Sequence, residues 1–332
     1  MQEAMLWHKE RNGVRCDLCH ARCFISKEKF GLCQVRKNEN NKLYTLNYEK
    51  VLGLNVDWVE KSLLFHFLPK SKSLFVSLPG CELNDNFCIN GSALENLEAK
   101  EISAEDVAEA AEKKGCKSIS YSFTEPTISF EFTFKIAKYA HRANIKNIFV
   151  TNGYVTEDAV KKIAKYLDAA SVRFKASGSK QFMTQYGLIP EISPVIDTLK
   201  QMKKHRIFLE IANTIIPQVG DDLEECRKLA ELINMEFGSE IPFHVLQFHP
   251  SPKFPGLPAT PISVLERCAD VARAAGLRFV YISNVSKNPN QNTYCYNCQE
   301  PLIIRENLST KKINLVDGRC PKCGLGINLV LK

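Results

Sequence analysis

The 332-residue sequence has no apolar run long enough to cross a membrane, and its N-terminus lacks the charged and then apolar pattern of a secretory signal. It contains no low-complexity tract and no run of Lys and Arg interleaved with aromatic residues. The net charge of +7 is modest for this length. These absences predict a cytoplasmic globular protein with no membrane or nucleic-acid partner. Residues 285–332 carry seven Lys or Arg against three Asp or Glu, an excess that we attribute to a solvated surface.

Cysteine, in contrast, is abundant, with 13 residues in the chain. The cytosol keeps thiols reduced, so metal ligation explains these cysteines better than disulfides do. Most of them fall into three groups, which are Cys16, Cys19, Cys23 and Cys33, then Cys81 and Cys88, and finally Cys295, Cys298, Cys320 and Cys323. The other three, Cys116, Cys226 and Cys268, lie in or beside helix and strand patterns and are expected to pack in the core.

The C-terminal cysteine group, Cys295, Cys298, Cys320 and Cys323, has the spacing of a zinc ribbon. Each C-x2-C pair forms a tight knuckle, and two knuckles complete a tetrahedral site for one metal ion. We therefore predict structural zinc within residues 285–332, with a rubredoxin-like iron site or disulfides as the alternatives.

The N-terminal cysteine group, Cys16, Cys19, Cys23 and Cys33, has a less diagnostic spacing. Four thiolates are able to hold one zinc ion or an auxiliary iron–sulfur cluster, and a disulfide framework is the non-metal alternative. Under either metal interpretation, residues 1–60 form a small module whose folding needs the metal, because so short a segment buries too little core.

Between residues 74 and 284 the sequence alternates between short apolar strands and amphipathic helices. The predicted strands are 74–78, 118–123, 147–151, 171–176, 208–216, 243–248 and 279–283. The predicted helices are 104–114, 127–143, 157–167, part of 190–205, 222–237 and 260–275. This order predicts an α/β fold with a parallel sheet, specifically a partial (β/α)6-type barrel over residues 61–284. Such barrels place their chemistry at the carboxyl ends of the strands.

One loop at such a strand end, Leu78–Asn90, contains Cys81, Asp85 and Cys88 in the spacing C-x3-D-x2-C. On its own this loop is better explained by two free thiols than by a metal site. Its interpretation depends on nine further blocks of sequence, which are Val14–Cys23, Gly31–Arg36, Lys42–Leu46, Leu64–Pro69, Thr124–Thr127, Val150–Tyr154, Gln247–Pro250, Gly276–Tyr281 and Asp317–Gly324.

With these blocks in order along nearly the whole chain, the sequence resembles radical S-adenosylmethionine (radical SAM) proteins of the AmmeMemoRadiSam group. These are relatives of the glycyl-radical activating enzymes and are often described as pyruvate formate-lyase activating enzyme-like. The resemblance implies a partial βα barrel that binds a [4Fe–4S] cluster and S-adenosylmethionine. Reduction of the cluster cleaves the cofactor to a 5′-deoxyadenosyl radical, which abstracts a hydrogen atom from a substrate.

The resemblance also implies roles for individual residues. Cys81 and Cys88 match cluster ligands, and Glu125 matches the acidic residue that contacts the amino group of the cofactor. Thr151 and Asn152 match the strand end beside the cofactor. Lys175 matches the lysine of the family's Asp-Leu-Lys strand, and His249 matches a residue near the adenosyl group.

Three residues depart from the family pattern. Asp85 stands where the family has the middle cluster cysteine, and a carboxylate is a harder ligand than the thiolates that irons of a cluster prefer. Arg173 replaces an aspartate, and Gln247 replaces an arginine. Together these changes indicate a reshaped cofactor site.

Two functional hypotheses remain open at this point. In the first, Cys81, Asp85 and Cys88 hold the cluster, and an electron donor drives cleavage of S-adenosylmethionine and attack on an unknown substrate, for which a protein is one candidate. In the second, the chain is a non-catalytic scaffold with zinc sites that acts through partners, AmmeMemoRadiSam-group proteins among them. A nucleic-acid-associated zinc protein ranks last.

Overall fold

The computed structural model describes residues 1–83, 85, 87–88, 90, 98–186, 189, 191–251 and 254–332. All predicted site residues lie in these ranges, whereas Pro190, at the start of a predicted helical segment, lies outside them. The described chain forms two compact units. Unit 1 comprises Met1–Asp57, Lys72–Ala170 and Thr184–Phe208, and unit 2 comprises Trp58–Ser71, Ser171–Met183 and Leu209–Lys332. The division of the chain at residues 60 and 284 stays a prediction.

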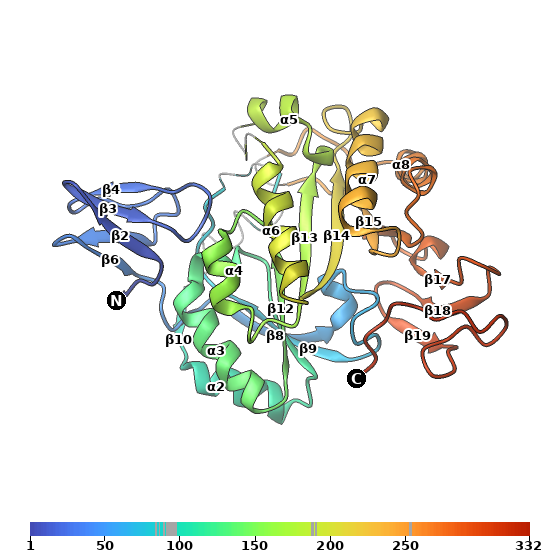
Figure 1. Cartoon of the computed structure of the whole chain (residues 1–332), viewed down its shortest axis with the longest axis horizontal. Coiled ribbons are helices and arrows are strands. Elements are labelled where there is room, and N and C mark those ends of the chain that lie inside the picture. The colour runs from blue at the N-terminus through green and yellow to red at the C-terminus, as the bar shows by residue number, and fades with distance from the viewer. Residues whose placement is uncertain are drawn as a thin grey trace. The chain divides into compact units, whose positions relative to one another are not determined.

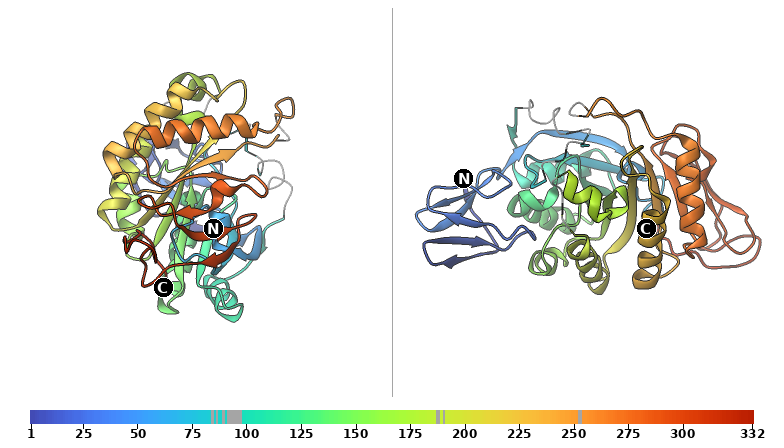
Figure 2. Two further views of the ribbon diagram at one scale, coloured as in Figure 1. Left: turned by 90° about the vertical axis from the view of Figure 1, so that its right-hand side faces the viewer. Right: turned by 90° about the horizontal axis from the view of Figure 1, so that it is seen from above.

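The N-terminal part of unit 1 consists of short antiparallel strands, drawn in dark blue in Figures 1 and 2. One three-stranded sheet contains β1 (Gln2–Glu3), β6 (Lys42–Thr45) and β5 (Arg36–Glu39). A second contains β2 (Trp7–Glu10), β3 (Gly13–Cys16) and β4 (Phe24–Ser26). A separate pair is formed by β7 (Lys50–Val51) and β10 (Lys100–Glu101).

The rest of unit 1 is an α/β arrangement. Its strands, in sheet order, are β8 (Gly53–Trp58), β9 (Lys72–Ser77), β11 (Ser118–Tyr121) and β12 (Lys146–Thr151). Its helical elements are α2 (Ala104–Lys113), η2 (Pro126–Ser129), α3 (Phe130–Arg142), α4 (Glu157–Ile163) and α6 (Ser193–Lys204). The pairs β9–β11 and β11–β12 are parallel. All four residues of β11 are buried, as expected for a parallel strand covered on both faces.

Unit 2 continues the same alternation and ends in an antiparallel sheet. Its strands are β13 (Ala169–Lys175), β14 (Phe208–Ile215), β15 (Phe243–Gln247) and β16 (Val280–Ser283), followed by β17 (Thr293–Tyr294), β18 (Pro301–Arg305) and β19 (Thr310–Ile313). Its helical elements are η1 (Val59–Ser62), η3 (Ala176–Gly178), α7 (Leu223–Phe237), α8 (Ile262–Ala274) and η4 (Pro289–Gln291). The short α5 (Lys180–Gln185) lies at the boundary of the units. Strands β14, β15 and β16 are parallel neighbours, and α7 packs against α8 (Figures 1 and 2).

The predicted alternation of parallel strands and helices is confirmed, and so are three helix starts. Ser103, Thr156 and Asp222 each accept a hydrogen bond from a backbone N–H in the first turn of the following helix. Helix 127–143 instead begins as the 3-10 turn Pro126–Ser129, and α4 ends at Ile163 and not near residue 167. Strand β8 and helix α5 were not predicted. None of the described helices combines the length and the apolar character needed to span a membrane.

A fully buried polar network connects the strands of unit 2. The His66 backbone N–H donates to Glu210 Oε1 at 2.7 Å, and His244 Nε2 lies 2.9 Å from Glu210 Oε2. His66 Nδ1 lies 2.8 Å from the Asn328 carbonyl oxygen, which can only accept, so Nδ1 carries the proton. His66 Nε2 then accepts from the Tyr281 hydroxyl at 2.6 Å. These contacts fix the segment around His66 against β14, β15 and β16.

We expect this network to make unit 2 sensitive to acid. Burial lowers the pKa of His66 to about 4, and the contacts of Glu210 with His244 hold the pKa of Glu210 below its ordinary value although burial alone would raise it. Both groups contribute stability at neutral pH that is lost as the pH falls. For His66 the loss begins near pH 6.5, its pKa in the unfolded chain, and ends near pH 4, its pKa in the folded protein. The loss attributable to His66 is about 3 kcal/mol.

Urea unfolding of wild type at pH 7 and pH 5, with metal content measured in parallel, tests this expectation. His66→Gln is expected to be less stable than wild type at pH 7, but its free energy of unfolding should fall less between pH 7 and pH 5. The exposed His141→Gln serves as the control. Equal acid loss in wild type and His66→Gln would contradict the role given to His66.

Candidate functional site

The predicted cofactor residues of unit 1 lie at the carboxyl ends of neighbouring parallel strands. Cys81 follows β9, Glu125 follows β11, and Thr151 is the last residue of β12. Because parallel strands end at the same edge of a sheet, these residues gather in one region of unit 1. This is the edge at which the sequence predicted the chemistry.

Glu125 is the most tightly held of these side chains. It is 3% exposed, and its Oε1 accepts from the Thr151 hydroxyl at 2.8 Å and from the Thr127 backbone N–H at 3.1 Å. Its Oε2 accepts from the Asn152 backbone N–H at 2.9 Å. Burial raises the pKa of Glu125, while these hydrogen bonds oppose that rise. Glu125, Thr151 and Asn152, which the sequence predicted as neighbours, are therefore brought together.

Glu82 belongs to the same constellation and was not predicted. Its Oε1 accepts from Asn152 Nδ2 at 2.8 Å. Its Oε2 is buried and accepts no hydrogen bond from the described part of the chain. Burial, together with the negative charge of Glu125, raises the pKa of Glu82 to about 8. In the sequence Glu82 looks like an ordinary charged residue of a loop. Its position directly after Cys81 is the only feature of the sequence that could have indicated its role.

The loop that carries the predicted cluster ligands is described in part. Cys81 is exposed, and Asp85 and Cys88 are half-buried. Asp85 Oδ1 accepts from the Phe87 backbone N–H at 3.0 Å, and the Asp85 carbonyl accepts from the Cys88 N–H at 3.2 Å. Asp85 thus forms an Asx-type turn that presents Cys88. A carboxylate has a second oxygen, so this turn is compatible with metal ligation by Asp85.

Gly80 sets the approach to this loop. Its φ of +118° favours glycine, and a Cβ at this position would lie 2.7 Å from the Ile128 side chain. Asn47 holds the preceding residue, because its Nδ2 donates to the Pro79 carbonyl at 2.7 Å and to Ser129 Oγ at 2.8 Å. The loop therefore leaves β9 in one fixed direction.

The remaining predicted cofactor residues lie in unit 2. Arg173 and Lys175 are both half-buried on the same face of β13, two residues apart. His249 follows β15, and its Nε2 lies 3.2 Å from the Asn284 carbonyl oxygen. Gln247 at the end of β15 donates to the Thr260 carbonyl at 2.8 Å. Each of these residues lies within two positions of the carboxyl end of its strand.

The four C-terminal cysteines converge on one point. Their sulfur atoms all lie within 4.8 Å of one another, with 3.5 Å between Cys295 and Cys323 and 3.6 Å between Cys298 and Cys320. Four thiolates at about 2.3 Å from one zinc ion stand about 3.8 Å apart, so the observed spacing fits a single tetrahedral ion. The pKa of Cys323 is lowered to about 6, mainly because the Leu325 backbone N–H forms a hydrogen bond with its sulfur atom.

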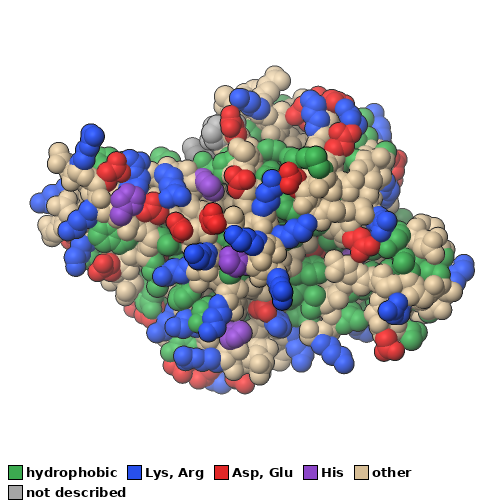
Figure 3. Space-filling view, in the orientation of Figure 1, with side chains coloured by type: hydrophobic (Ala, Val, Ile, Leu, Met, Phe, Trp, Pro, Cys, Tyr) green, Lys and Arg blue, Asp and Glu red, His purple; other side chains and the backbone are tan. Residues whose placement is uncertain are grey.

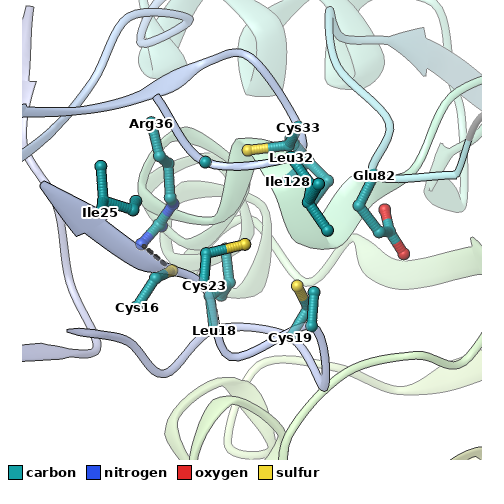
Figure 4. A pocket seen from close by; sticks show the side chains of 12 residues that line it. Cys16, Leu18, Cys19, Cys23, Ile25, Leu32, Cys33, Arg36, Glu82 and Ile128 are labelled. Atoms are coloured by element: carbon teal, nitrogen blue, oxygen red, sulfur yellow. Dashed lines mark hydrogen bonds between the residues drawn. The ribbon is translucent and has the colours of Figure 1, made fainter. Parts of the chain in front are cut away.

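The four N-terminal cysteines line a pocket of unit 1, shown in Figure 4. The pocket also contains Glu82, the buried Arg36 and the apolar side chains Ile25 and Ile128. Although all four of these cysteines are described, their sulfur atoms do not form a group of the close kind seen at the C-terminus.

On the face drawn in Figure 3, positive and negative side chains are interspersed over α3 and α4.

Comparison with known proteins identifies the family. Residues 75–233 match the Radical SAM superfamily. The chain is 34% identical over 338 residues to a Methanocaldococcus jannaschii protein named Uncharacterized protein MJ0808, and the match covers 100% of both chains. The chain contains a radical SAM domain and belongs to the family of this archaeal protein.

The chain is also similar to solved structures. Streptococcus suis SuiB, bound to the precursor peptide SuiA, has a TM-score of 0.50 and 19% identity, and the match covers 68% of this chain and 51% of SuiB. The chain thus spans about half the length of SuiB. A domain of the pyruvate-formate lyase-activating enzyme of Bacteroides vulgatus has a TM-score of 0.43 and 15% identity, and the match covers 50% of this chain and 99% of that domain.

A radical SAM domain implies an iron–sulfur cluster and S-adenosylmethionine, and the residues of unit 1 fit the cofactor. S-adenosylmethionine carries an ammonium and a sulfonium group, and the strand ends of unit 1 offer two carboxylates, Glu82 and Glu125. Neither carboxylate pairs with a Lys or Arg of the described chain. Buried carboxylates normally have a cationic partner, and a cationic ligand would provide one.

The spacing of the C-terminal cysteine group predicts its metal content. Purified protein should contain at least one zinc ion per chain, and the Cys320→Ser/Cys323→Ser variant about one fewer, because two thiolates cannot retain the ion. Elemental analysis of both proteins is the measurement. The buried Cys116→Ser controls for loss of a thiol, and a folded protein without zinc, or an unchanged zinc content in the double variant, would refute the assignment.

Proposed function

We propose that this protein is a radical SAM enzyme of the AmmeMemoRadiSam group that reductively cleaves S-adenosylmethionine. The observation that carries the proposal is the pair of carboxylates, Glu82 and Glu125, at the strand ends of a radical SAM domain without a cation of the described chain beside them. Burial raises the pKa of both groups, and a cationic ligand bound beside them would stabilise their ionised forms.

Each residue of unit 1 has a distinct task in this proposal. Glu125 accepts the ammonium group of the cofactor and is kept in place by Thr151 and by the Asn152 backbone. Glu82, whose raised pKa of about 8 favours its protonated form in the free protein, would become a second negative charge when the cationic cofactor binds, and Asn152 orients it through its side-chain amide. Burial strengthens both attractions because little water screens them.

The cluster would be held by Cys81, Asp85 and Cys88, with two thiolates and one carboxylate. The turn at Asp85 orients that side chain through its Oδ1. When bound and reduced by an electron donor, the cluster supplies the electron that cleaves S-adenosylmethionine into methionine and a 5′-deoxyadenosyl radical, which takes a hydrogen atom from the substrate. In unit 2 we propose cofactor-binding roles for Lys175 and His249, which match the family pattern, and for Arg173, which departs from it.

Substrate and partners are part of the proposal. The family resemblance suggests a protein substrate, so we propose a protein substrate or an AmmeMemoRadiSam-group partner in the cytoplasm. SuiB, whose fold this chain shares, is bound to a precursor peptide in its solved structure. Zinc in the C-terminal cysteine group would be structural, because the four cysteines leave no ligand position for chemistry.

One observation favours the second candidate function, a scaffold without radical chemistry. Asp85 already has a structural task, since its side chain caps the turn before Cys88 through the Phe87 N–H. An aspartate kept for this turn would not need to bind iron, and the protein would then act through partners.

Cofactor binding tests the role of the two carboxylates. Anaerobic calorimetry on reconstituted protein should show S-adenosylmethionine binding that Glu125→Ala and Glu82→Gln each weaken by about tenfold or more. A charge-assisted hydrogen bond contributes about 1.5–3 kcal/mol. The exposed Glu112→Gln should bind as wild type does. Absence of binding to wild type would exclude the enzyme, whereas equal binding by a variant would exclude only that residue's role.

Three substitutions at one position separate the two candidate functions. Asp85→Asn keeps the hydrogen-bond acceptor that forms the turn but removes the anionic ligand. Asp85→Cys supplies a thiolate, and Asp85→Ala removes both features. If Asp85 binds the cluster, Asp85→Cys should retain at least as much cluster iron as wild type and cleave more S-adenosylmethionine, while Asp85→Asn and Asp85→Ala should lose cluster iron.

The measurements are iron content, paramagnetic resonance and 5′-deoxyadenosine formation after identical anaerobic reconstitution. The Cys81→Ala/Cys88→Ala variant gives the baseline for a loop without a cluster. Wild-type iron equal to that baseline would show that Asp85 is not a ligand and would favour the scaffold. Zinc content should be the same in all of these proteins.

A further inference from the structure

The N-terminal cysteine group occupies a defined site in unit 1. Cys16 is the last residue of β3, Cys23 precedes β4, and Cys19 lies in the hairpin between them. Cys33 reaches the same pocket from the loop before β5 (Figure 4). Cys16 and Cys19 are buried, while Cys23 and Cys33 are half-buried. Four thiols from two separate loops thus line one pocket, which indicates a common ligand.

The hairpin is fixed by tertiary contacts as well as by its own strands. Cys19 forms a β-bridge with Val155, in the loop that follows β12. The Thr156 hydroxyl donates to the Asp17 carbonyl at 2.7 Å, and the Thr156 N–H donates to the Leu18 carbonyl at 3.2 Å. The cysteines are therefore held beside the same strand end that carries Thr151.

A buried cation lies beside one of the sulfur atoms. Arg36 is 1% exposed, forms a 2.5 Å ion pair with Glu131, and directs Nη1 toward Cys16 Sγ at 3.6 Å (Figure 4). An N–H group directed at sulfur stabilises thiolate charge and is a common feature around metal-bound cysteines. Ile25 and Ile128 provide an apolar wall.

We propose that Cys16, Cys19, Cys23 and Cys33 hold an iron–sulfur cluster of their own, separate from the loop of Cys81 and Cys88. Four thiolates in an apolar pocket suit iron and sulfide. The C-terminal sulfurs all lie within 4.8 Å of one another, whereas the N-terminal sulfurs form no such close group in the described chain, an arrangement that suits a polynuclear cluster better than one zinc ion.

The test starts from full-length Cys81→Ala/Cys88→Ala protein, so its result does not depend on the proposed radical SAM activity. After anaerobic reconstitution and desalting, this protein should retain iron and sulfide in similar amounts and show visible charge-transfer absorption. Adding Cys19→Ser and Cys33→Ser should abolish both, whereas adding Cys116→Ser, a buried cysteine outside all three groups, should leave both unchanged. Circular dichroism checks that each variant is folded.

Absence of iron and sulfide from the starting protein, or their full retention after the two serine substitutions, would overturn the proposal. A second zinc ion lost with these substitutions would overturn the iron–sulfur assignment. If the serine variants do not fold, the rate of alkylation of the half-buried Cys23 and Cys33 is measured in the starting protein instead. An iron chelator should accelerate alkylation at both cysteines at least tenfold, and an unchanged rate would refute the site.

Discussion

The carboxylate of Glu125 is the interaction on which the candidate site depends. Its two oxygens accept three hydrogen bonds, from the Thr151 hydroxyl and from the Thr127 and Asn152 backbones. These donors lie after β11 and at the end of β12, so one buried group joins two strand ends. Glu82 reaches the same place through Asn152 Nδ2. Burial raises the pKa of both carboxyl groups, so a cation bound between or beside them would favour their ionised forms.

The same strand end also anchors the N-terminal cysteines. Val155 and Thr156, which follow Asn152 and Gly153, form the β-bridge and hydrogen bonds that hold the hairpin around Cys19. A short antiparallel module has too little core to fix its own cysteines. Attachment to the buried α/β part of unit 1 holds these cysteines in place instead. The Arg36–Glu131 ion pair, whose side chains are 1% and 2% exposed, adds to this attachment. The candidate site around Glu125 and the cysteine pocket therefore share the segment that follows β12.

Much of this arrangement was predictable from the sequence, because it follows from local rules. The caps at Ser103, Thr156 and Asp222 are side-chain patterns, and the placement of Glu125 and Thr151 at strand ends follows from the alternation of strands and helices. Glu82 was not predictable, because its importance comes from Asn152, which is 70 positions away in the sequence. The 3-10 start of the helix before Phe130 likewise reflects Glu125, which turns back to accept the Thr127 N–H.

Asp85 shows why a single residue leaves the chemistry open. In the sequence it is a substitution at a ligand position, whereas in the structure it is also the acceptor that shapes the turn before Cys88. A thiol is a weak acceptor, so a cysteine at this position would give up the turn in order to bind iron more strongly. Aspartate keeps the turn and offers a harder oxygen ligand, so a cluster held here would exchange iron more readily than one with three thiolates. In a protein that holds a cluster at this loop, the carboxylate would therefore give a weaker cluster ligand in exchange for a preformed turn.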